Sequence, residues 1–517
     1  MKGTVYLVGS GPGDPGLLTV KAMQLIRRAD VIVYDYLANP AHLKEALPSA
    51  VKVCVGRGFR HKKLSQDRID RLIVGAAKKG KTVVRLKGGD PYLFGRGGEE
   101  ALFLKRHRIP FQVVPGITSA VACAAYAGIP LTHRSLSSSV TFLTGHKAND
   151  GDLDSIPWKS IVSLGHGTIV IYMGFYNLGR IVQSLVAHGM PAKTRAAVIE
   201  WGTLPKQRSC EADLASIAAL TRQKKFRAPC IIVIGKVIAL RRSLNWFETL
   251  PLFGKKIVIT RTREQSTTLR ETLEDLGAQV VEFPAIRIES LSNFSKMDRV
   301  IRSLSTYDEI VFASVNGVRA FFDRILEIGR DARSLGKCHV TAVGPQTAAE
   351  ILKYGVKPDR IPTHYETKAI VEELGRKPDA LKGKRMLLVR ASAATQNLEH
   401  DLKKLGARVD RLDAYRTLLP KSVPADLKSV ILKGRVDAVT FTSASTAEHF
   451  VQLLGEKKAR AIAKRALVAS IGPVTSAALR KNGLPPGCEA SVFTVDGLVK
   501  ALVKKMKKMS FRDDEFS

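Results

Sequence analysis

Two glycine-rich stretches near the start of the chain carry its clearest chemical signal. The first, Arg85–Glu100, has the sequence RLKGGDPYLFGRGGEE and follows a short apolar run. Glycines lack a Cβ, so the main chain can approach a flat polar ligand and adopt positive φ angles. Asp90, in the middle of these glycines, would supply a fixed negative charge. The stretch predicts a ligand-binding loop, and taken alone it also fits an ordinary surface turn.

The second stretch, GPGDPG at 11–16, satisfies the dinucleotide pattern G-x-G-x-x-G. That pattern works by presenting backbone N–H groups to a pyrophosphate, and Pro12 and Pro15 each remove one such donor. The sequence shows no second fingerprint with a ribose-binding acid, so we reject a nicotinamide-dependent oxidoreductase. A loop with few donors suits S-adenosylmethionine, whose sulfonium prefers carbonyl oxygens and a carboxylate to a nest of amides.

The elements that must position these loops follow an alternating strand and helix pattern. Thr4–Gly9 is predicted as a buried strand, and Asp14 with Pro15 signals the start of a helix. Asp35 ends a second apolar run, at the carboxyl end of a strand, where α/β folds place ligands. On this evidence Asp35 is either a functional carboxylate or a local cap.

A series of motifs in order along residues 1–245 resembles the uroporphyrinogen-III C-methyltransferases of the tetrapyrrole methylase family. The motifs are GSGPGDPGLLT, VIVYD, VVRLKGGDPYLFGRGGEE, VVPGITSA, GIPLTHR, LTGH, YMG and WGT. The resemblance implies a two-lobed α/β enzyme, usually a homodimer, with S-adenosylmethionine in the cleft between the lobes and methylation of the porphyrinogen at C2 and C7 to precorrin-2. It assigns the cofactor contacts to Pro12, Gly88, Gly89, Asp90, Leu93, Thr118, Ser119, Met173 and Gly202.

The same resemblance makes Asp35 the candidate general base, which would take up the proton displaced by carbon methylation. Where the family often has a lysine, this chain has Arg57. An arginine stays protonated, so we assign Arg57 to binding substrate carboxylates. His61, His133 and His146 have no partners at metal-ligand spacing, and we interpret them as loop-fixing or substrate-contacting residues.

Beyond a linker at 246–254, the chain contains an internal duplication. IVITR at 257–261 recurs as MLLVR at 386–390, and the segment ending at Ser314 recurs with its end at Ser443, so the offset is 390 − 261 = 443 − 314 = 129. Short apolar runs alternate with helical patterns in both copies, which predicts parallel sheets covered by helices and a cleft between two lobes. Hydroxyls and Gly-Pro-x-Thr turns after the strands suit carboxylates, and they also cap helices.

Residues 255–505 resemble uroporphyrinogen-III synthase. The resemblance implies cyclisation of hydroxymethylbilane to uroporphyrinogen III with inversion of ring D. Tyr415 is then the candidate that assists departure of the hydroxyl group, although an aromatic packed at a strand end is an alternative. The residues expected to hold substrate carboxylates are Arg261, Ser314, Asn316, Thr347, Ser443 and Thr475. We also expect a discontinuous lobe around a hinge near Pro284 and Asp413.

Composition fits an α/β enzyme with a two-lobed methylase fold followed by a two-lobed parallel α/β synthase fold. The 517 residues suffice for about three or four compact lobes. A net charge of +35 would steer substrates with many carboxylates. A basic nucleic-acid-binding protein is the alternative, disfavoured because aromatic residues are not interleaved with the charge.

The remaining expectations concern compartment and partners. Six cysteines without a C-x-x-C pattern indicate a reducing compartment and no metal site. The sequence has neither a membrane-length apolar run nor a signal peptide, which predicts a cytoplasmic protein without membrane or nucleic-acid partners. Residues 506–517 are predicted as a polar tail.

Overall fold

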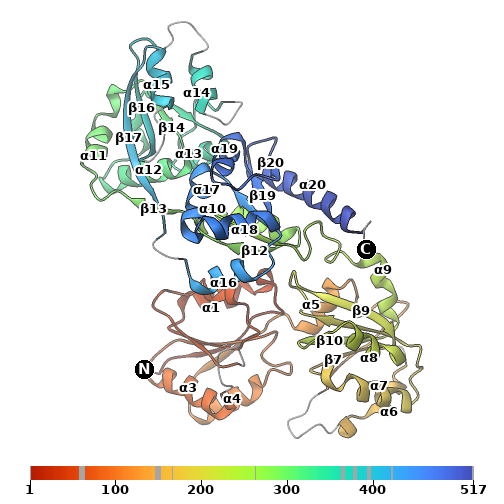
Figure 1. Cartoon of the computed structure of the whole chain (residues 1–517). Helices are drawn as coiled ribbons and strands as arrows, with labels where there is room; N and C mark the ends of the chain where they lie inside the picture. Colours follow the sequence, from red (N-terminus) through yellow and green to blue (C-terminus); the bar gives the residue numbers. More distant parts are fainter. Residues whose placement is uncertain are drawn as a thin grey trace. The chain divides into compact units, whose positions relative to one another are not determined.

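The computed structural model describes residues 2–56, 64–145, 153–165, 167–261, 263–362, 367–375, 381–392, 397–420 and 423–514. The chain forms two compact units. The first comprises Met1–Lys255 with Asp275–Gln279, and the second comprises Lys256–Glu274 with Val280–Ser517. Each unit contains two of the four five-stranded sheets (Figure 1).

The first sheet of the first unit is parallel throughout. Its strand order is β3 (Val51–Cys54), β2 (Val31–Tyr34), β4 (Val83–Lys87), β1 (Val5–Gly9) and β5 (Phe111–Val114). Helices α3 (Gln66–Lys78) and α4 (Gly97–Arg106) pack on one face, and α1 (Val20–Arg28) packs on the other. Side chains alternate along β1, so Leu7 contacts the first core and Val8 contacts the second.

The second sheet is mixed, because only β6 and β7 pair in parallel. Its order is β6 (Val140–Thr144), β7 (Thr168–Tyr172), β10 (Cys230–Ile234), β8 (Arg195–Glu200) and β9 (Arg208–Asp213). One face is covered by α6 (Trp158–Ser163), α7 (Leu178–Ala187) and α8 (Leu214–Gln223), and the other face by α5 (Ser119–Tyr126). The short helices of this unit are α2 (Pro40–Leu43) and α9 (Arg241–Leu244).

The second unit distributes the duplicated sequence over two lobes. One sheet has the order β12 (Gln279–Glu282), β11 (Lys256–Ile259), β18 (Ala438–Phe441), β19 (Leu467–Ser470) and β20 (Cys488–Glu489). The other has the order β13 (Arg287–Ser290), β17 (Arg408–Leu418), β16 (Arg385–Ala391), β14 (Glu309–Phe312) and β15 (His339–Ala342). One sheet therefore combines β11 and β12 of the first copy with β18, β19 and β20 of the second, and the other combines β16 and β17 of the second copy with β13, β14 and β15 of the first, which confirms the expected discontinuous lobe.

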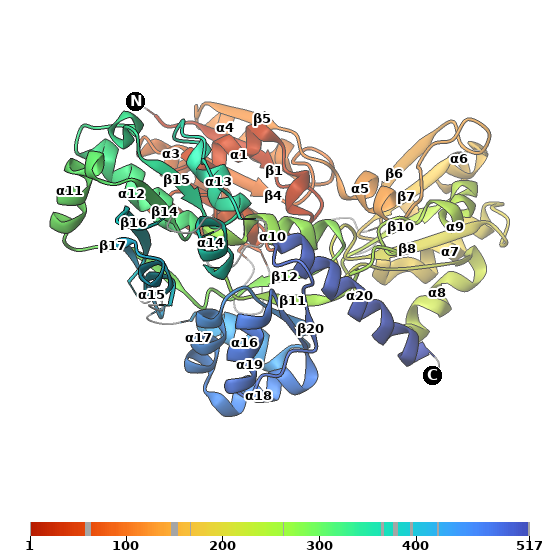
Figure 2. The same cartoon turned by 90° about the horizontal axis from the view of Figure 1, so that it is seen from above.

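Figure 2 shows these two lobes as separate groups of elements. Around β13–β17 lie α11 (Ser295–Arg302), α12 (Val315–Glu327), α13 (Pro345–Leu352), α14 (Thr367–Leu374) and α15 (Asn397–Lys404). Around β11–β20 lie α10 (Arg263–Asp275), α16 (Ala425–Lys433), α17 (Ala444–Leu454), α18 (Glu456–Arg465), α19 (Pro473–Lys481) and α20 (Val495–Asp514). Helix α20 continues to Asp514, so much of the segment predicted as a polar tail is helical, and Met506 is buried.

The chain crosses between the lobes next to Pro284, where β12 ends and β13 follows. The hinge was also expected near Asp413, and the pairing of β17 changes next to that residue. Asp413 is inside β17, where it pairs with Arg390 of β16. β17 remains in its lobe up to Leu418 because its far end also pairs antiparallel with β13.

Candidate functional sites

Two glycine-rich loops lie side by side at the carboxyl ends of β1 and β4. Gly89 N donates a hydrogen bond to Gly11 O at 2.8 Å, and Gly11 N donates to Gly89 O at 3.3 Å. Both glycines have positive φ angles, 76° and 68°, so a side chain at either position would be strained. A Cβ on Gly88 would lie 3.1 Å from Leu37 Cβ. The loops that contain Pro12, Gly88 and Gly89 are thus held together by their own backbone.

The carboxylate of Asp90 joins this pair to the loop after β5. Its Oδ1 accepts hydrogen bonds from the backbone N–H groups of Tyr92 at 2.7 Å and Leu93 at 3.1 Å. Its Oδ2 accepts from Gly116 N at 3.0 Å. Although the sequence predicts a charge presented to a ligand, the structure shows both oxygens bound to backbone. Asp90 therefore shapes the loop on which Leu93 lies.

A second group of loops meets at the start of α5. Thr118 Oγ1 lies 2.6 Å from the hydroxyl of Tyr172, and Ala120 N donates to the same hydroxyl at 3.3 Å. Tyr172 ends β7 and precedes Met173, which has a φ of 52° and is 51% exposed. Ser119 is the first residue of α5.

Gly202 also contacts α5 closely, since a Cβ on it would lie 2.3 Å from Cys123 Sγ. The same segment returns to the first loop, because Asp14 N donates to Thr203 Oγ1 at 3.0 Å. The two groups are linked at Gly89, where an added Cβ would lie 3.7 Å from Ser119 N. The nine residues predicted to contact the cofactor therefore all lie on loops that the structure brings together.

Asp35 follows β2 at the same end of the first sheet and belongs to a buried ion network. Its Oδ1 accepts a hydrogen bond from Arg85 Nη2 at 2.8 Å, and Arg85 Nε donates to Glu100 Oε1 at 3.1 Å. Lys87 Nζ donates to the same Glu100 oxygen at 2.9 Å, and burial lowers the pKa of Lys87. Arg85 and Glu100 are 2% and 1% exposed. Paired charges of this kind hold a carboxylate in one orientation.

Sequence reasoning did not find Arg85, Lys87 or Glu100 as a network. The available signal was the pair of cations within the otherwise apolar run VVRLK. Arg57, His61 and His146 lie outside the described residues. His133 accepts a hydrogen bond from Ser135 N through Nδ1 at 3.3 Å, which favours the loop-fixing interpretation of this histidine.

The second unit contains a cavity of about 540 Å³, lined from both lobes. Six of the predicted residues line it, namely Arg261, Ser314, Asn316, Thr347, Tyr415 and Ser443. Thr475 is buried in α19 and does not line the cavity. Phe493 and Thr494 occupy that part of the wall. Phe493 lies close to Gly472, because a Cβ added to this glycine would be 2.9 Å from Phe493 Cδ1.

Four helices begin at the cavity wall within the described residues, one of them α20, which starts at Val495. Ser314 caps α12 and accepts from Gly317 N at 3.1 Å, Gly344 precedes α13, and Ser443 caps α17 and accepts from Thr446 N at 3.4 Å. The N-terminus of a helix carries partial positive charge and unpaired N–H groups. None of the described lining residues is acidic. These features make the cavity electropositive.

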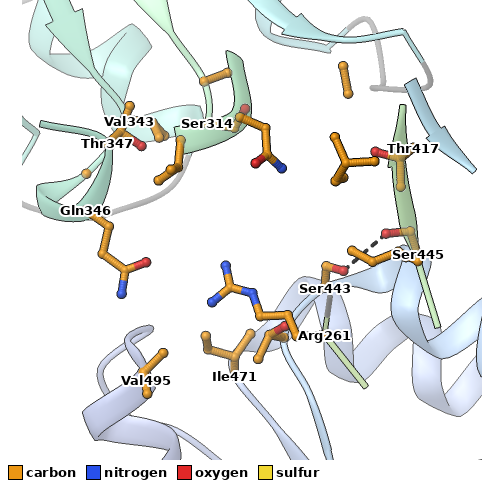
Figure 3. A pocket seen from close by; sticks show the side chains of 18 of the residues that line it. Arg261, Ser314, Val343, Gln346, Thr347, Thr417, Ser443, Ser445, Ile471 and Val495 are labelled. Atoms are coloured by element: carbon orange, nitrogen blue, oxygen red, sulfur yellow. Dashed lines mark hydrogen bonds between the residues drawn. The ribbon is translucent and has the colours of Figure 1, made fainter. Parts of the chain in front are cut away.

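Arg261 is the one charged side chain among the described lining residues. Its guanidinium has no hydrogen-bond or ion-pair partner within the described ranges, and burial lowers its pKa. Figure 3 shows it extending toward the middle of the cavity, between Gln346 and Ser443. A buried cation without a partner is costly, so this position favours an anionic ligand.

Tyr415 presents its hydroxyl to the same cavity from β17. The hydroxyl lies 3.0 Å from Ser314 Oγ. Ser314 follows β14, which is separated from β17 in the sheet by β16. Five further polar lining residues were missed from the sequence, namely Gln346, Thr417, Thr442, Ser445 and Thr494. Thr417 could have been predicted from the sequence, because Tyr415 was already a candidate and residues two apart on a strand point to the same face.

Comparisons with known proteins cover both units. The family of Tetrapyrrole (Corrin/Porphyrin) Methylases matches residues 4–218, and the family Uroporphyrinogen-III synthase HemD matches residues 267–500. The porphyrin biosynthesis protein HemD of Ruminiclostridium josui is 36% identical over 503 residues, which cover 97% of this chain and 98% of that protein.

Two further similarities concern the methylase. The uroporphyrinogen-III C-methyltransferase of Bacillus subtilis (strain 168) is 37% identical over 369 residues, covering 71% of this chain and 75% of that protein. The crystal structure of uroporphyrin-III C-methyl transferase from Thermus thermophilus complexed with S-adenyl homocysteine is 38% identical, with a TM-score of 0.40, and covers 46% of this chain and 100% of that chain.

The fold and the sites define a bifunctional α/β enzyme of tetrapyrrole biosynthesis. The chain belongs to the family in which a tetrapyrrole methylase is fused to a uroporphyrinogen-III synthase. Within the described ranges, no helix is long and apolar enough to cross a membrane. The same ranges contain no group of three or more His, Cys, Asp or Glu side chains that could hold a metal ion.

Proposed function

We propose that the second unit cyclises hydroxymethylbilane to uroporphyrinogen III with inversion of ring D. We further propose that the first unit transfers methyl groups from S-adenosylmethionine to C2 and C7 of that product, which gives precorrin-2. The observation that carries the proposal is the electropositive cavity of the second unit, where several helices begin and where the guanidinium of Arg261 has no partner among the described residues.

The cavity suits a flexible substrate with many carboxylates. Hydroxyls of Ser314, Thr347 and Ser443, the amide of Asn316 and the first-turn N–H groups can each bind a carboxylate oxygen. Fixing a flexible linear tetrapyrrole in one folded geometry brings its two ends together and removes much of the entropic barrier to ring closure. The isomer formed is then decided by which carbon of ring D lies next to the reacting end.

Tyr415 would assist departure of the hydroxyl group. Its O–H can donate to the leaving oxygen, so that the carbon–oxygen bond breaks and water leaves, while Ser314 Oγ at 3.0 Å orients the phenol. The bond electrons depart with the oxygen, and the pyrrole nitrogen lone pair stabilises the electron-poor carbon as an azafulvenium ion. Loss of the pyrrole N–H proton gives the neutral azafulvene, and this proton balances the one that Tyr415 gave to the leaving water. Attack by ring D at its substituted carbon gives the spiro intermediate that rearranges to the inverted ring.

The residues of the first unit fit S-adenosylmethionine. Pro12 adds no N–H donor to the loop, and Gly88 and Gly89 leave the backbone uncovered by side chains. Pro12, Gly88, Gly89, Leu93, Thr118, Ser119, Met173 and Gly202 would hold the cofactor, with Asp90 shaping the loop. When bound, the cofactor supplies an electrophilic methyl group.

The protein's own part in methylation is orientation and proton removal. Asp35, held by Arg85, would take up the proton that leaves the methylated pyrrole carbon, and Arg57 would bind a substrate carboxylate. The resemblance also supports a homodimer formed through this unit. Sedimentation of the full chain would test that assembly.

The decisive experiment is an anaerobic incubation with hydroxymethylbilane and S-adenosylmethionine, followed by chromatography and mass analysis of the oxidised products. A dimethylated type III product is expected. Unmethylated type I product alone, the isomer that forms without an enzyme, would refute the cyclisation. Type III product without methyl groups would refute methyl transfer while the cyclisation stands.

A further inference from the structure

The two lobes of the second unit are related by a pseudo-two-fold axis that passes through the cavity wall. In the antiparallel pair of β13 and β17, Ile288 lies opposite Thr417. These residues are 417 − 288 = 129 positions apart, which is the offset of the duplication. The axis therefore runs between them, and both line the cavity.

The neighbouring pairs obey the same symmetry. Arg287 pairs with Leu418, and Glu289 pairs with Arg416. The offset converts one pair into the other, because 416 − 287 = 418 − 289 = 129. The two strands thus correspond residue by residue across the axis, and a substitution on one strand has a defined counterpart on the other.

Part of the lining respects this symmetry. Ser314 and Ser443 correspond, and both cap a helix at the cavity. Asn316 corresponds to Ser445, and both are polar. A cavity that was symmetric throughout would accept a chain of four similar rings equally well in either direction, and in one of the two directions the hydroxymethyl group would lie at the wrong lobe.

Other lining residues differ between the two sides of the axis in the chemical groups that they present. Tyr415 and Thr417 on β17 correspond to Ile286 and Ile288, and all four line the cavity, so one side carries two hydroxyls and the other two aliphatic side chains.

The cations differ as well. Arg261 lines the cavity, whereas its counterpart Arg390 is 6% exposed within β16 and does not. One side of the axis therefore offers hydroxyl groups and the other offers a cation.

We propose that Thr417, together with Tyr415, determines the direction in which the linear substrate binds. The end that carries the hydroxymethyl group lies against β17, and carboxylates of other rings lie at Arg261. The inference rests on the proposed cyclisation and adds Thr417 as a specificity-determining residue. The Thr417 hydroxyl has no partner among the described residues, and Figure 3 shows it across the cavity from Thr347 and Gln346.

The test adds the missing hydroxyl at the symmetry-related position. Ile288→Thr places a hydroxyl like that of Thr417 on the neighbouring strand, directly across the axis, which makes reversed binding more favourable without removing any group from the productive mode. Unproductive binding lowers kcat and KM by the same factor and leaves kcat/KM unchanged. We expect a parallel fall of about two- to five-fold, the worth of one neutral hydrogen bond. Ile288→Val has the shape of threonine without its hydroxyl and should behave as the unsubstituted chain.

The reciprocal variant removes the directing hydroxyl. Thr417→Val should lower kcat/KM for cyclisation by about two- to ten-fold, since a favourable contact is lost from the productive mode. Thermal unfolding and methyl transfer to supplied uroporphyrinogen III check that each variant is folded.

Identical constants for Ile288→Thr and Ile288→Val would overturn the inference, and so would a rise in KM alone. If the unsubstituted chain forms no type III product above the spontaneous reaction, the proposed function fails instead.

Discussion

Asp90→Asn tests whether this carboxylate acts through the loop that it holds. The change keeps the size of the side chain and replaces one acceptor oxygen with an NH₂ group. The remaining oxygen can still accept from Tyr92 N and Leu93 N. The new amide nitrogen then faces Gly116 N, which is itself a donor. The substitution therefore breaks the link between the two loops and leaves each loop's own turn intact.

The size of the effect follows from that one link. A hydrogen bond to a charged group contributes about 1.5–3 kcal/mol, and partial exposure of Asp90 favours the lower part of this range. If cofactor binding requires the two loops to be in contact, the free energy of the lost hydrogen bond is subtracted from the free energy of cofactor binding. Every 1.4 kcal/mol is a factor of about ten, so we expect S-adenosylhomocysteine affinity to fall about 10- to 40-fold. Asp90→Ala loses all three bonds and should abolish methyl transfer.

Calorimetric titration with S-adenosylhomocysteine measures the change directly. Asp331→Asn is the matched control, because Asp331 also accepts from a backbone N–H, that of Arg333 at 2.9 Å, but lies in the second unit. Cyclisation should be unaffected in Asp90→Asn. An affinity within about twofold of the unsubstituted chain, with methyl transfer lost, would refute the reasoning and place Asp90 in direct contact with the reacting groups.

Three further outcomes are expected. Tyr415→Phe should slow cyclisation by about 10²-fold through loss of hydroxyl assistance, with methyl transfer to supplied uroporphyrinogen III unchanged; an unaltered cyclisation rate would make Tyr415 a packing residue. Gly116→Ala should abolish methyl transfer, because its Cβ would lie 2.3 Å from Gly89 O, whereas Gly98→Ala, with nothing within 4 Å, should not. The hydrogen bond from Arg319 lowers the pKa of Glu350 below its ordinary 4.5, so this contact stabilises the chain above that pH and is lost as pH falls. Between about pH 6 and pH 3, Tm should therefore fall less in Glu350→Gln than in the unsubstituted chain, and equal falls would contradict the assignment.

The motifs predicted which loops meet in the first unit but not what Asp90 does there. Its role depends on Gly116, which is distant in sequence and becomes a neighbour only because β1 pairs with both β4 and β5. The buried ion network in the first unit could likewise not be predicted from the sequence alone. Arg85 and Lys87 occupy strand positions that normally take apolar side chains, and they are stable there because Glu100 reaches them from α4.

In the second unit the duplication predicted the exchange of strands between lobes, yet two details depended on packing. The hinge was expected near both Pro284 and its counterpart, Asp413. β17 continues past Asp413, since β13 supplies an extra partner along its edge. Thr475 was expected in the cavity as the counterpart of Thr347. Phe493 and Thr494, which belong to neither repeated motif, line that part of the wall instead.

The exchange of strands also explains why the cavity can be asymmetric at all. Because each lobe takes two strands from one copy and three from the other, both copies contribute to both walls. A substitution in one copy therefore changes only one side of the axis, as at Thr417 and Ile288. The duplicated fold can keep its carboxylate-binding caps at Ser314 and Ser443 on both sides while the reacting groups diverge. A repetitive substrate with one distinct end needs a site with this combination of shared and divergent walls.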